Sequence, residues 1–288
     1  MNVALRRVVL AAATTALFSA FAPAVAVELD PAAVKILPPE QFKWRDPTDQ
    51  AGTNQVILLG EPNKQGSLYV QINRFKPDRG FGNAHYHPNE RFINVIMGAA
   101  WRGTGSVVDP NHATRVPKGT FMIDHATKAH WDGTKGEPGA YLISGIGPST
   151  SIDLPKDNGP YRGGDPSAVT IKLPNQIQWT ENERNRSAIL AGDPDKPGLY
   201  VTMFTWRKGN FGRPHIHPND RYFYVLEGTW WTATGNKFDP ALAVPAKAGS
   251  FVSVFAKGVH WDGAKDEDAT VVFIGEGPAT STRVEEAK

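Results

Sequence analysis

Six of the eight histidines in this 288-residue chain form two sets with the same spacing. They are His85, His87 and His130, and His215, His217 and His260. A His-x-His pair in a β-strand places both imidazoles on one face, because side chains alternate with a period of two. The third histidine of each set must then come from another strand that crosses the same face. Three converging imidazoles are typical of a site for Zn, Cu, Fe, Ni or Mn, so the sequence predicts one divalent transition metal in each half.

The two histidine sets lie inside a much longer internal repeat. Phe81–Arg91 recurs 130 residues later as Phe211–Arg221, and His130–Gly133 recurs as His260–Gly263. A repeat of this length is a duplicated domain rather than a solenoid unit. Residues 147–165 are rich in Pro and Gly and are predicted to be the linker. We therefore expect an N-terminal domain over residues 27–160 and a C-terminal domain over residues 161–288.

The composition and the absence of certain motifs exclude several classes of function. The net charge of +2 is close to balance and offers no electrostatic reason to expect nucleic acid as a partner. The chain has no cysteine, which excludes disulfides, cysteine-ligated zinc and thiol nucleophiles. It also shows no nucleophile elbow, phosphate loop or dinucleotide fingerprint, so hydrolase and nucleotide-dependent activities have no support.

Residues 1–26 have the pattern of a signal peptide. Arg6 and Arg7 precede an apolar run from Val8 to Ala22, and Ala24–Ala26 offers a small-x-small cleavage site. A membrane anchor is the alternative, but the apolar run is short and Pro23 interrupts its end. The adjacent arginines loosely resemble a twin-arginine signal. We expect a periplasmic or secreted protein with no membrane attachment after cleavage.

The remaining chain has short strand patterns separated by Gly and Pro. Residues 67–75, 91–97, 199–206 and 221–226 alternate or run apolar, with many β-branched and aromatic side chains. Helical periodicity is hard to find. The expected fold class is all-β, with frequent short strands as in sandwiches and barrels.

These motifs resemble those of the cupin superfamily. The first cupin motif reads G-x5-H-x-H-x3-4-E-x6-G, and the second half offers Gly209, His215, His217 and Gly228 at that spacing. The second motif places a Gly eleven residues before a His, as Gly119 stands before His130. The resemblance covers both halves, so it implies a bicupin of two tandem cupin (double-stranded β-helix, or jelly-roll) barrels. Among cupins, it looks closest to exported proteins with an HxHPN[DE]R segment.

The first motif departs from the family pattern at its glutamate. Arg91 and Arg221 occupy that position, and the acidic residue stands one place earlier, as Glu90 and Asp220. On a regular strand the arginine would face the histidines and the acid would face away. We favour a three-His site in which Glu90, Arg91, Asp220 and Arg221 form ion pairs or contact substrate. The alternative is that Pro88 and Pro218 bulge the strand and bring Glu90 and Asp220 in as fourth ligands.

Other residues near the motifs are candidates for roles around the metal site rather than for ligands. Asp132 and Asp262 follow the third histidine of each set and could orient an imidazole, or could simply be turn residues. His112 and His125 have no counterpart in the second half and are expected outside the metal-ligand set. Several aromatic residues could line the barrel or form its core: Trp101, Tyr222, Tyr224, Trp230 and Trp231.

The resemblance implies a metal-dependent oxidoreductase, since cupins with three-His sites include dioxygenases of diketones, phenols and thiols. The expected substrate or ligand is a small organic molecule. Two alternatives stay open: a non-catalytic periplasmic protein that binds metal or a small ligand, and a metal-assisted isomerase or lyase. Cupin halves commonly pack as a two-barrel unit, so the chain is expected to be a monomeric bicupin or a homo-oligomer of it.

Overall fold

The computed structural model describes residues 28–45 and 53–287, and these residues form β-strands, short 3-10 turns and loops. The expected signal peptide lies outside the described residues. The only helical segments in this part of the chain are four 3-10 turns of three residues each. The prediction of an all-β fold is therefore confirmed. Within the described ranges, no helix has the length and apolar character needed to span a membrane.

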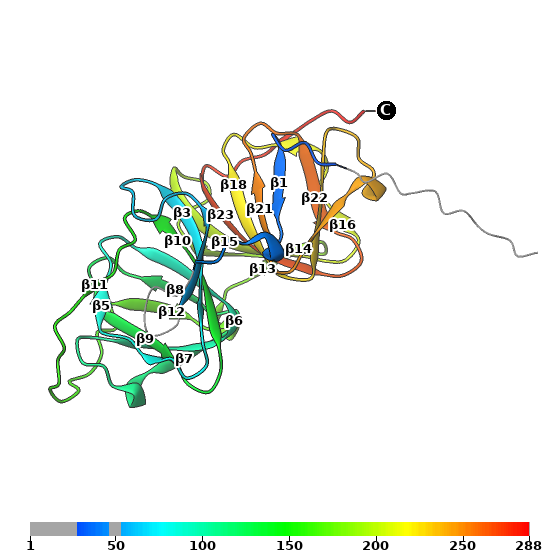
Figure 1. The fold of residues 1–288 in the computed structure, drawn as a ribbon. Helices are drawn as coiled ribbons and strands as arrows, with labels where there is room; N and C mark the ends of the chain where they lie inside the picture. The colour runs from blue at the N-terminus through cyan, green and yellow to red at the C-terminus, as the bar shows by residue number, and fades with distance from the viewer. Residues whose placement is uncertain (1–27, 46–52, 288) are drawn as a thin grey trace, which may run out of the picture.

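The N-terminal half folds into one barrel of two antiparallel sheets (Figure 1). The first sheet has the order β2–β3–β10–β6–β8–β12, with bounds Asn54–Leu59, Leu68–Phe75, Gly139–Ile146, Arg91–Thr104, Phe121–Asp124 and Val169–Lys172. The second contains β11, β5, β9, β4 and β7, with bounds Ile152–Asp153, His85–Tyr86, His130–Thr134, Gly80–Phe81 and Thr114–Pro117. The long strand β6 belongs to both sheets and joins them.

The C-terminal half repeats this barrel (Figure 1). Its first sheet has the order β13–β14–β15–β23–β18–β21–β1, with bounds Thr180–Glu181, Asn185–Ala191, Gly198–Trp206, Ala269–Gly277, Arg221–Glu227, Phe251–Val254 and Val34–Leu37. Its second contains β20, β19, β22, β17, β24 and β16, with bounds Val244–Lys247, Thr229–Thr234, His260–Ala264, His215–Ile216, Thr282–Arg283 and Asn210–Phe211. Gly228, with a φ of 71°, makes the bend between β18 and β19 where the chain passes from one sheet to the other.

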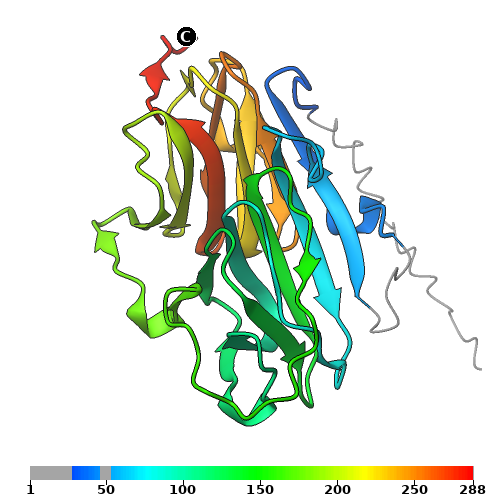
Figure 2. The same ribbon diagram turned by 90° about the vertical axis from the view of Figure 1, so that its left-hand side faces the viewer.

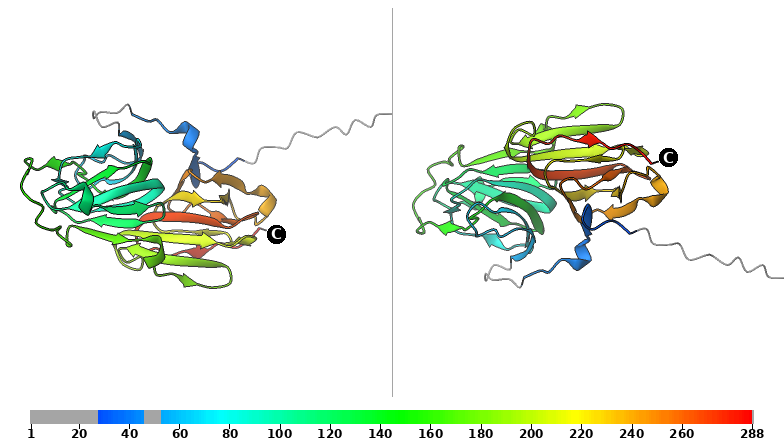
Figure 3. Two further views of the ribbon diagram at one scale, coloured as in Figure 1. Left: turned by 90° about the horizontal axis from the view of Figure 1, so that it is seen from below. Right: turned by 90° about the horizontal axis from the view of Figure 1, so that it is seen from above.

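The two barrels exchange one strand each. β1 precedes the N-terminal barrel in sequence but pairs with β21 of the C-terminal barrel, where Val34 lies opposite Val254. β12, which follows the N-terminal barrel, pairs in the same register with β8, where Val169 lies opposite Asp124. Figures 2 and 3 show the blue β1 beside the yellow-to-red strands. Strand pairing therefore crosses the division at residues 160 and 161 that the repeat suggests.

The described residues form four apolar clusters, and the three largest hold this arrangement together. One fills the N-terminal barrel around Ile93 and Met122, and another fills the C-terminal barrel around Phe223 and Trp230. The third lies between the barrels and joins residues of both halves, among them Phe121 and Tyr224. Burying each such large side chain contributes about 1.5–3 kcal/mol. Of the aromatic residues noted in the sequence, Trp230 is inside its barrel, whereas Tyr222 and Tyr224 pack against the other barrel.

Candidate metal centres and the cavity of the C-terminal barrel

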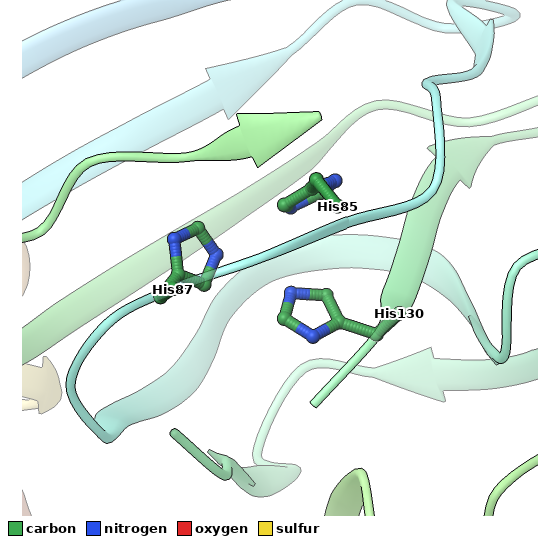
Figure 4. Close-up of side chains that lie close together, drawn as sticks. All are labelled: His85, His87 and His130. Carbon is green, nitrogen blue, oxygen red and sulfur yellow. The ribbon is translucent and has the colours of Figure 1, made fainter. Parts of the chain in front are cut away.

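Both histidine triads come together inside their barrels. His85 on β5 lies opposite His130 on β9, and His87 follows β5 by one residue. Figure 4 shows the three imidazoles converging on one point. His215 on β17 lies opposite His260 on β22 in the same way. In each triad, the candidate ligand atoms all lie within 4.8 Å of one another, so two groups could hold a metal ion.

The second nitrogen of every ring is held by the backbone. The Nδ1 atoms of His85, His87 and His130 lie 2.9, 2.9 and 3.1 Å from the carbonyl oxygens of Asn83, Thr150 and Lys128. Those of His215, His217 and His260 lie 2.7, 3.0 and 2.9 Å from the carbonyl oxygens of Arg213, Thr280 and Gly258. A carbonyl only accepts, so Nδ1 carries the proton in a neutral ring and Nε2 presents its lone pair to the centre.

The Nε2 atoms fit a bound cation. In the N-terminal triad, the Nε2 atoms of His87 and His130 are buried and have no hydrogen-bond partner. In the C-terminal triad, the Nε2 atoms of His215 and His217 lie 3.1 Å apart. Two nitrogens bound at about 2.1 Å to one ion lie roughly 3 Å apart when they are adjacent. Buried acceptors without a donor are costly, and a divalent transition metal held by three imidazoles would satisfy them.

The protonation state of the rings also suits a metal. Burial, followed by the positive charge of Arg91, lowers the pKa of His87 to about 2. Burial and then Arg221 lower the pKa of His217 to about 3 in the other barrel. Burial and then Arg102 lower the pKa of His130 as well. His87, His130 and His217 are therefore neutral near pH 7, which is the form that binds metal.

Around the N-terminal triad, buried arginines and aspartates form a continuous chain of ion pairs. Asp124 on β8 accepts from Arg91, at 2.9 Å, and from Arg102. Asp132 accepts from Arg102 at 2.8 Å and from Arg79 at 3.1 Å. We call these five residues the N-terminal charge network. Asp124 also places a carboxylate oxygen 3.5 Å from Nε2 of His130, so the charges reach the edge of the triad.

The C-terminal barrel lacks most of this network. Val254 stands at the position of Asp124, Thr232 at that of Arg102 and Gly209 at that of Arg79. Arg221, the counterpart of Arg91, donates to the backbone carbonyl of Thr280 at 3.1 Å. Among the described residues it makes no ion pair, and Asp262 acts on it only at longer range. Arg221 is therefore available to an anion.

A cavity of about 540 Å³ opens beside the C-terminal triad, and of the three uncharged replacements only Val254 lines it. All three histidines of the C-terminal triad line it, together with Arg221 and Asp262. The rest of its wall is largely aromatic and apolar, contributed by Tyr200, Phe204, Trp206, Trp230, Val254 and Phe273. Two other cavities, of about 650 Å³ each, are lined by segments of the N-terminal half and not by its triad. Of these three cavities, only the first reaches a histidine triad.

The acidic residues of the first motif do not reach the triads. Glu90 lies 2.9 Å from Nδ1 of His125, and its side chain is half exposed. Asp220 accepts from the hydroxyl of Tyr222 at 3.1 Å and from the backbone of Ala256 at 2.8 Å. β5 ends before Pro88 and β6 begins at Arg91, so a turn separates the acid from the strand that bears the histidines. Arg91 and Arg221 lie beside the triads. Glu90 and Asp220 form an ion pair with neither arginine.

The remaining candidates lie around the sites rather than in them. Asp132 pairs with arginines, and Asp262 lines the cavity, while the imidazole Nδ1 atoms go to backbone carbonyls. Nε2 of His125 lies 2.9 Å from the hydroxyl of Thr170 on the exchanged strand β12. His112 stacks on Tyr161 at the surface.

Three residues of the N-terminal charge network were not anticipated from the sequence, namely Arg79, Arg102 and Asp124. Arg102 and Asp124 interrupt the apolar strand segments AAWRG and FMID, and charged residues are rarely fully buried unless they are paired. A charged residue within an apolar strand segment is therefore the sequence feature that could have predicted this network. The second repeat obscured it, because Thr232 and Val254 there are uncharged.

Comparison with solved structures supports the architecture. The crystal structure of the oxalate decarboxylase formate complex from Lactobacillus farciminis superposes with a TM-score of 0.59, at 13% identity, over 86% of this chain and 88% of that one. The structure of oxalate decarboxylase from Bacillus subtilis at pH 4.6 gives 0.58 at 14% identity, over 86% and 78%. A cupin 2 conserved barrel domain protein from Leptotrichia buccalis gives 0.55 at 15% identity, over 88% and 100%.

The fold is that of a bicupin. The prediction of two tandem cupin barrels is confirmed, and the two triads fit a metal-binding cupin. No family model and no curated protein matches the sequence. At identities of 13 to 15%, the bicupin likeness concerns the fold alone.

Proposed function

We propose that this protein is a metal-dependent oxidoreductase of the oxygenase type that converts a small organic substrate in its C-terminal barrel. One observation carries the proposal: His215, His217 and His260 open on a cavity with aromatic walls and an unpaired arginine. Pockets of roughly 300–1,000 Å³, mostly apolar with a few converging polar groups, are typical of small-molecule sites. The N-terminal triad, surrounded by its charge network, serves a structural role.

Three neutral imidazoles leave coordination positions of a divalent transition metal open, and a reduced metal there would supply electrons for reaction with dioxygen. His215, His217 and His260 would hold that metal through Nε2. Arg221 neutralises and orients an anionic group of the substrate beside the triad. The aromatic wall holds the apolar part of the substrate and excludes water, which strengthens the electrostatic contacts inside the cavity.

The first test is metal analysis of the protein recovered from its native compartment. We expect about two equivalents per chain, falling to about one in either His85→Ala or His215→Ala. Oxygen uptake with catechols, diketones and flavonoids should be lost in His215→Ala and largely retained in His85→Ala, because only the C-terminal triad opens on the cavity. A protein without transition metal, or with equal losses of oxygen uptake in both variants, would contradict the proposal.

A lyase is the second candidate, because two of the solved structures with this fold are oxalate decarboxylases. The same preparation distinguishes the two reactions. A lyase would release product, with CO₂ from a carboxylic acid, without consuming oxygen. Metal and ligand binding with neither reaction would instead indicate a binding protein.

We also propose that the chain is exported and cleaved after Ala26. The support is the order of Arg6-Arg7, the apolar run and Ala24–Ala26. Amino-terminal sequencing of protein from the periplasm or the medium should begin at Val27. A chain that keeps Met1 in the cytoplasm would contradict this.

A further inference from the structure

The C-terminal cavity combines an aromatic wall with an excess of positive charge. Phe204 and Phe273 meet edge to face at 5.6 Å between ring centroids, and Trp206 and Trp230 do so at 6.3 Å. Three arginines and two carboxylates line the cavity: Arg213, Arg221, Arg283, Asp195 and Asp262. A divalent cation at the triad would add to this excess. The wall therefore suits a flat apolar ligand, and the charge suits an anion.

The arginines are not equivalent. Arg213 is engaged, since it donates to Glu286 at 3.4 Å and covers the ring of Phe238. Arg283 is exposed on β24. Arg221 is partly buried beside His217, and its hydrogen bond to the backbone of Thr280 uses only Nη2. The rest of its planar guanidinium remains free to bind a carboxylate in a bidentate manner.

The two barrels show what frees Arg221. In the N-terminal barrel, Asp124 pairs with Arg91 at 2.9 Å and occupies it. In the C-terminal barrel, Val254 replaces that aspartate at the same register position, opposite Arg221. Val254 is itself part of the cavity wall. The substitution therefore removes an internal carboxylate and leaves an apolar side chain opposite the arginine.

We propose that the C-terminal cavity binds an aromatic or conjugated monocarboxylic acid, with its carboxylate on Arg221 beside the triad and its ring between the aromatic walls. The inference rests on the proposed function, because it names the substrate class for the same site. A two-carbon acid would leave most of the 540 Å³ unfilled. A doubly charged phosphate would meet Asp262 in addition to Arg221. A monocarboxylate places its single charge on the arginine and buries its apolar part.

Calorimetric titration with cinnamate, and with cinnamamide as its neutral isostere, tests this on protein whose metal content has been measured. We expect one cinnamate per chain, bound about tenfold or more tightly than cinnamamide, because a hydrogen bond to a charged group is stronger than a neutral one. Arg221→Gln should weaken cinnamate binding about tenfold or more and leave cinnamamide binding nearly unchanged.

Val254→Asp is an independent variant. The new carboxylate would stand where Asp124 stands in the other barrel and would occupy Arg221, so cinnamate affinity should fall while Arg221 is still present. Arg184→Gln is the matched control, since it removes the same charge from an exposed position outside the cavity lining and should change affinity by less than about threefold, as expected for screened surface charge.

Equal affinity for cinnamate and cinnamamide in the unmodified protein would overturn the inference, whatever the variants do. So would an unchanged cinnamate affinity in metal-loaded Arg221→Gln, or an equal loss in Arg184→Gln. These results are distinguishable from failure of the proposed function. Selective cinnamate binding without any oxygen uptake would overturn the oxygenase, whereas oxygen uptake with neutral substrates only would overturn the carboxylate site.

Discussion

At the residue scale, the two barrels differ in the partner of one arginine. Arg91 and Arg221 follow the His-x-His pair at the same distance, and both lie beside a triad. In the N-terminal barrel, Asp124 forms ion pairs with Arg91 and with Arg102, which is fully buried. Buried charges are tolerated only when they are paired, so Asp124 is needed wherever both arginines are present.

Replacement of Asp124 by Asn should strongly destabilise the protein. Arg91 and Arg102 would each lose a charged partner in a site closed to water, and breaking a buried pair in this way costs about 3–5 kcal/mol. The measurement is the free energy of unfolding from urea denaturation of metal-free wild type and variant, which keeps metal binding out of the comparison.

Glu61→Gln provides the control. It breaks the ion pair with Lys64 in which the two side chains are 69% and 65% exposed. Such a pair contributes about 0–1 kcal/mol. If Asp124→Asn cost no more than Glu61→Gln, the charge network would not be a stabilising feature of the barrel.

The residues that the sequence made predictable are those with a repeated pattern. The period of two in His85-Tyr86-His87 and the matched spacing of His130 and His260 placed six imidazoles in two groups. The direction of Glu90 was harder to predict, because the chain turns between β5 and β6 and alternation stops there. The partners of Arg91 were not predictable, since Asp124 lies on another strand and no spacing rule links the two.

At the element scale, the exchanged strands are the main departure from a simple tandem repeat. The sequence predicts short apolar strands, but an apolar strand does not specify which sheet edge it joins. β1 is an example. Its Val34 is buried in the C-terminal barrel against Val254, although β1 precedes the whole N-terminal barrel in sequence. The register of β1 on β21 repeats that of β12 on β8, so the exchange is reciprocal.

A change in β1 should therefore be felt in the C-terminal barrel. Val34→Ala removes two buried methyl groups from the cluster around Phe223 and should cost about 2 kcal/mol. Native-state hydrogen exchange should accelerate at the amides of β21 and β18 more than at those of β8. Lys35→Ala, on the exposed face of the same strand, should stay within about 0.5 kcal/mol. Faster exchange confined to β8 would show that β1 belongs to the other barrel in solution.

At the scale of the whole molecule, the barrels share a core as well as strands. The cluster between them includes Val70, Ile72 and Leu142 from one side and Val201, Met203 and Val272 from the other. These side chains lie on the outer faces of their sheets, so only the partner barrel covers them. Each half alone would expose this apolar face and would also lack one strand.

Separating the chain at the repeat boundary should therefore abolish stable folding of both parts. Fragment 27–160 lacks β12, and fragment 161–288 lacks β1. We expect neither to show a cooperative thermal transition alone, because each fragment lacks a strand and exposes an apolar face, and a domain of this size buries only enough surface to be marginally stable. Mixing the two from denaturant should restore a single transition, as read by near-ultraviolet circular dichroism and size-exclusion chromatography.

A fragment of residues 38–173 makes the comparison quantitative. It omits β1, which the N-terminal barrel does not use, and retains β12, which completes the sheet beside β8. It still exposes the face that packs against the other barrel, so it should be less stable than the whole chain but more stable than 27–160. If 27–160 unfolded cooperatively at the same temperature as 38–173, the exchanged strand would contribute nothing to the N-terminal barrel. If both matched the intact protein, each barrel would be an independent domain, and the shared core would be only a contact surface.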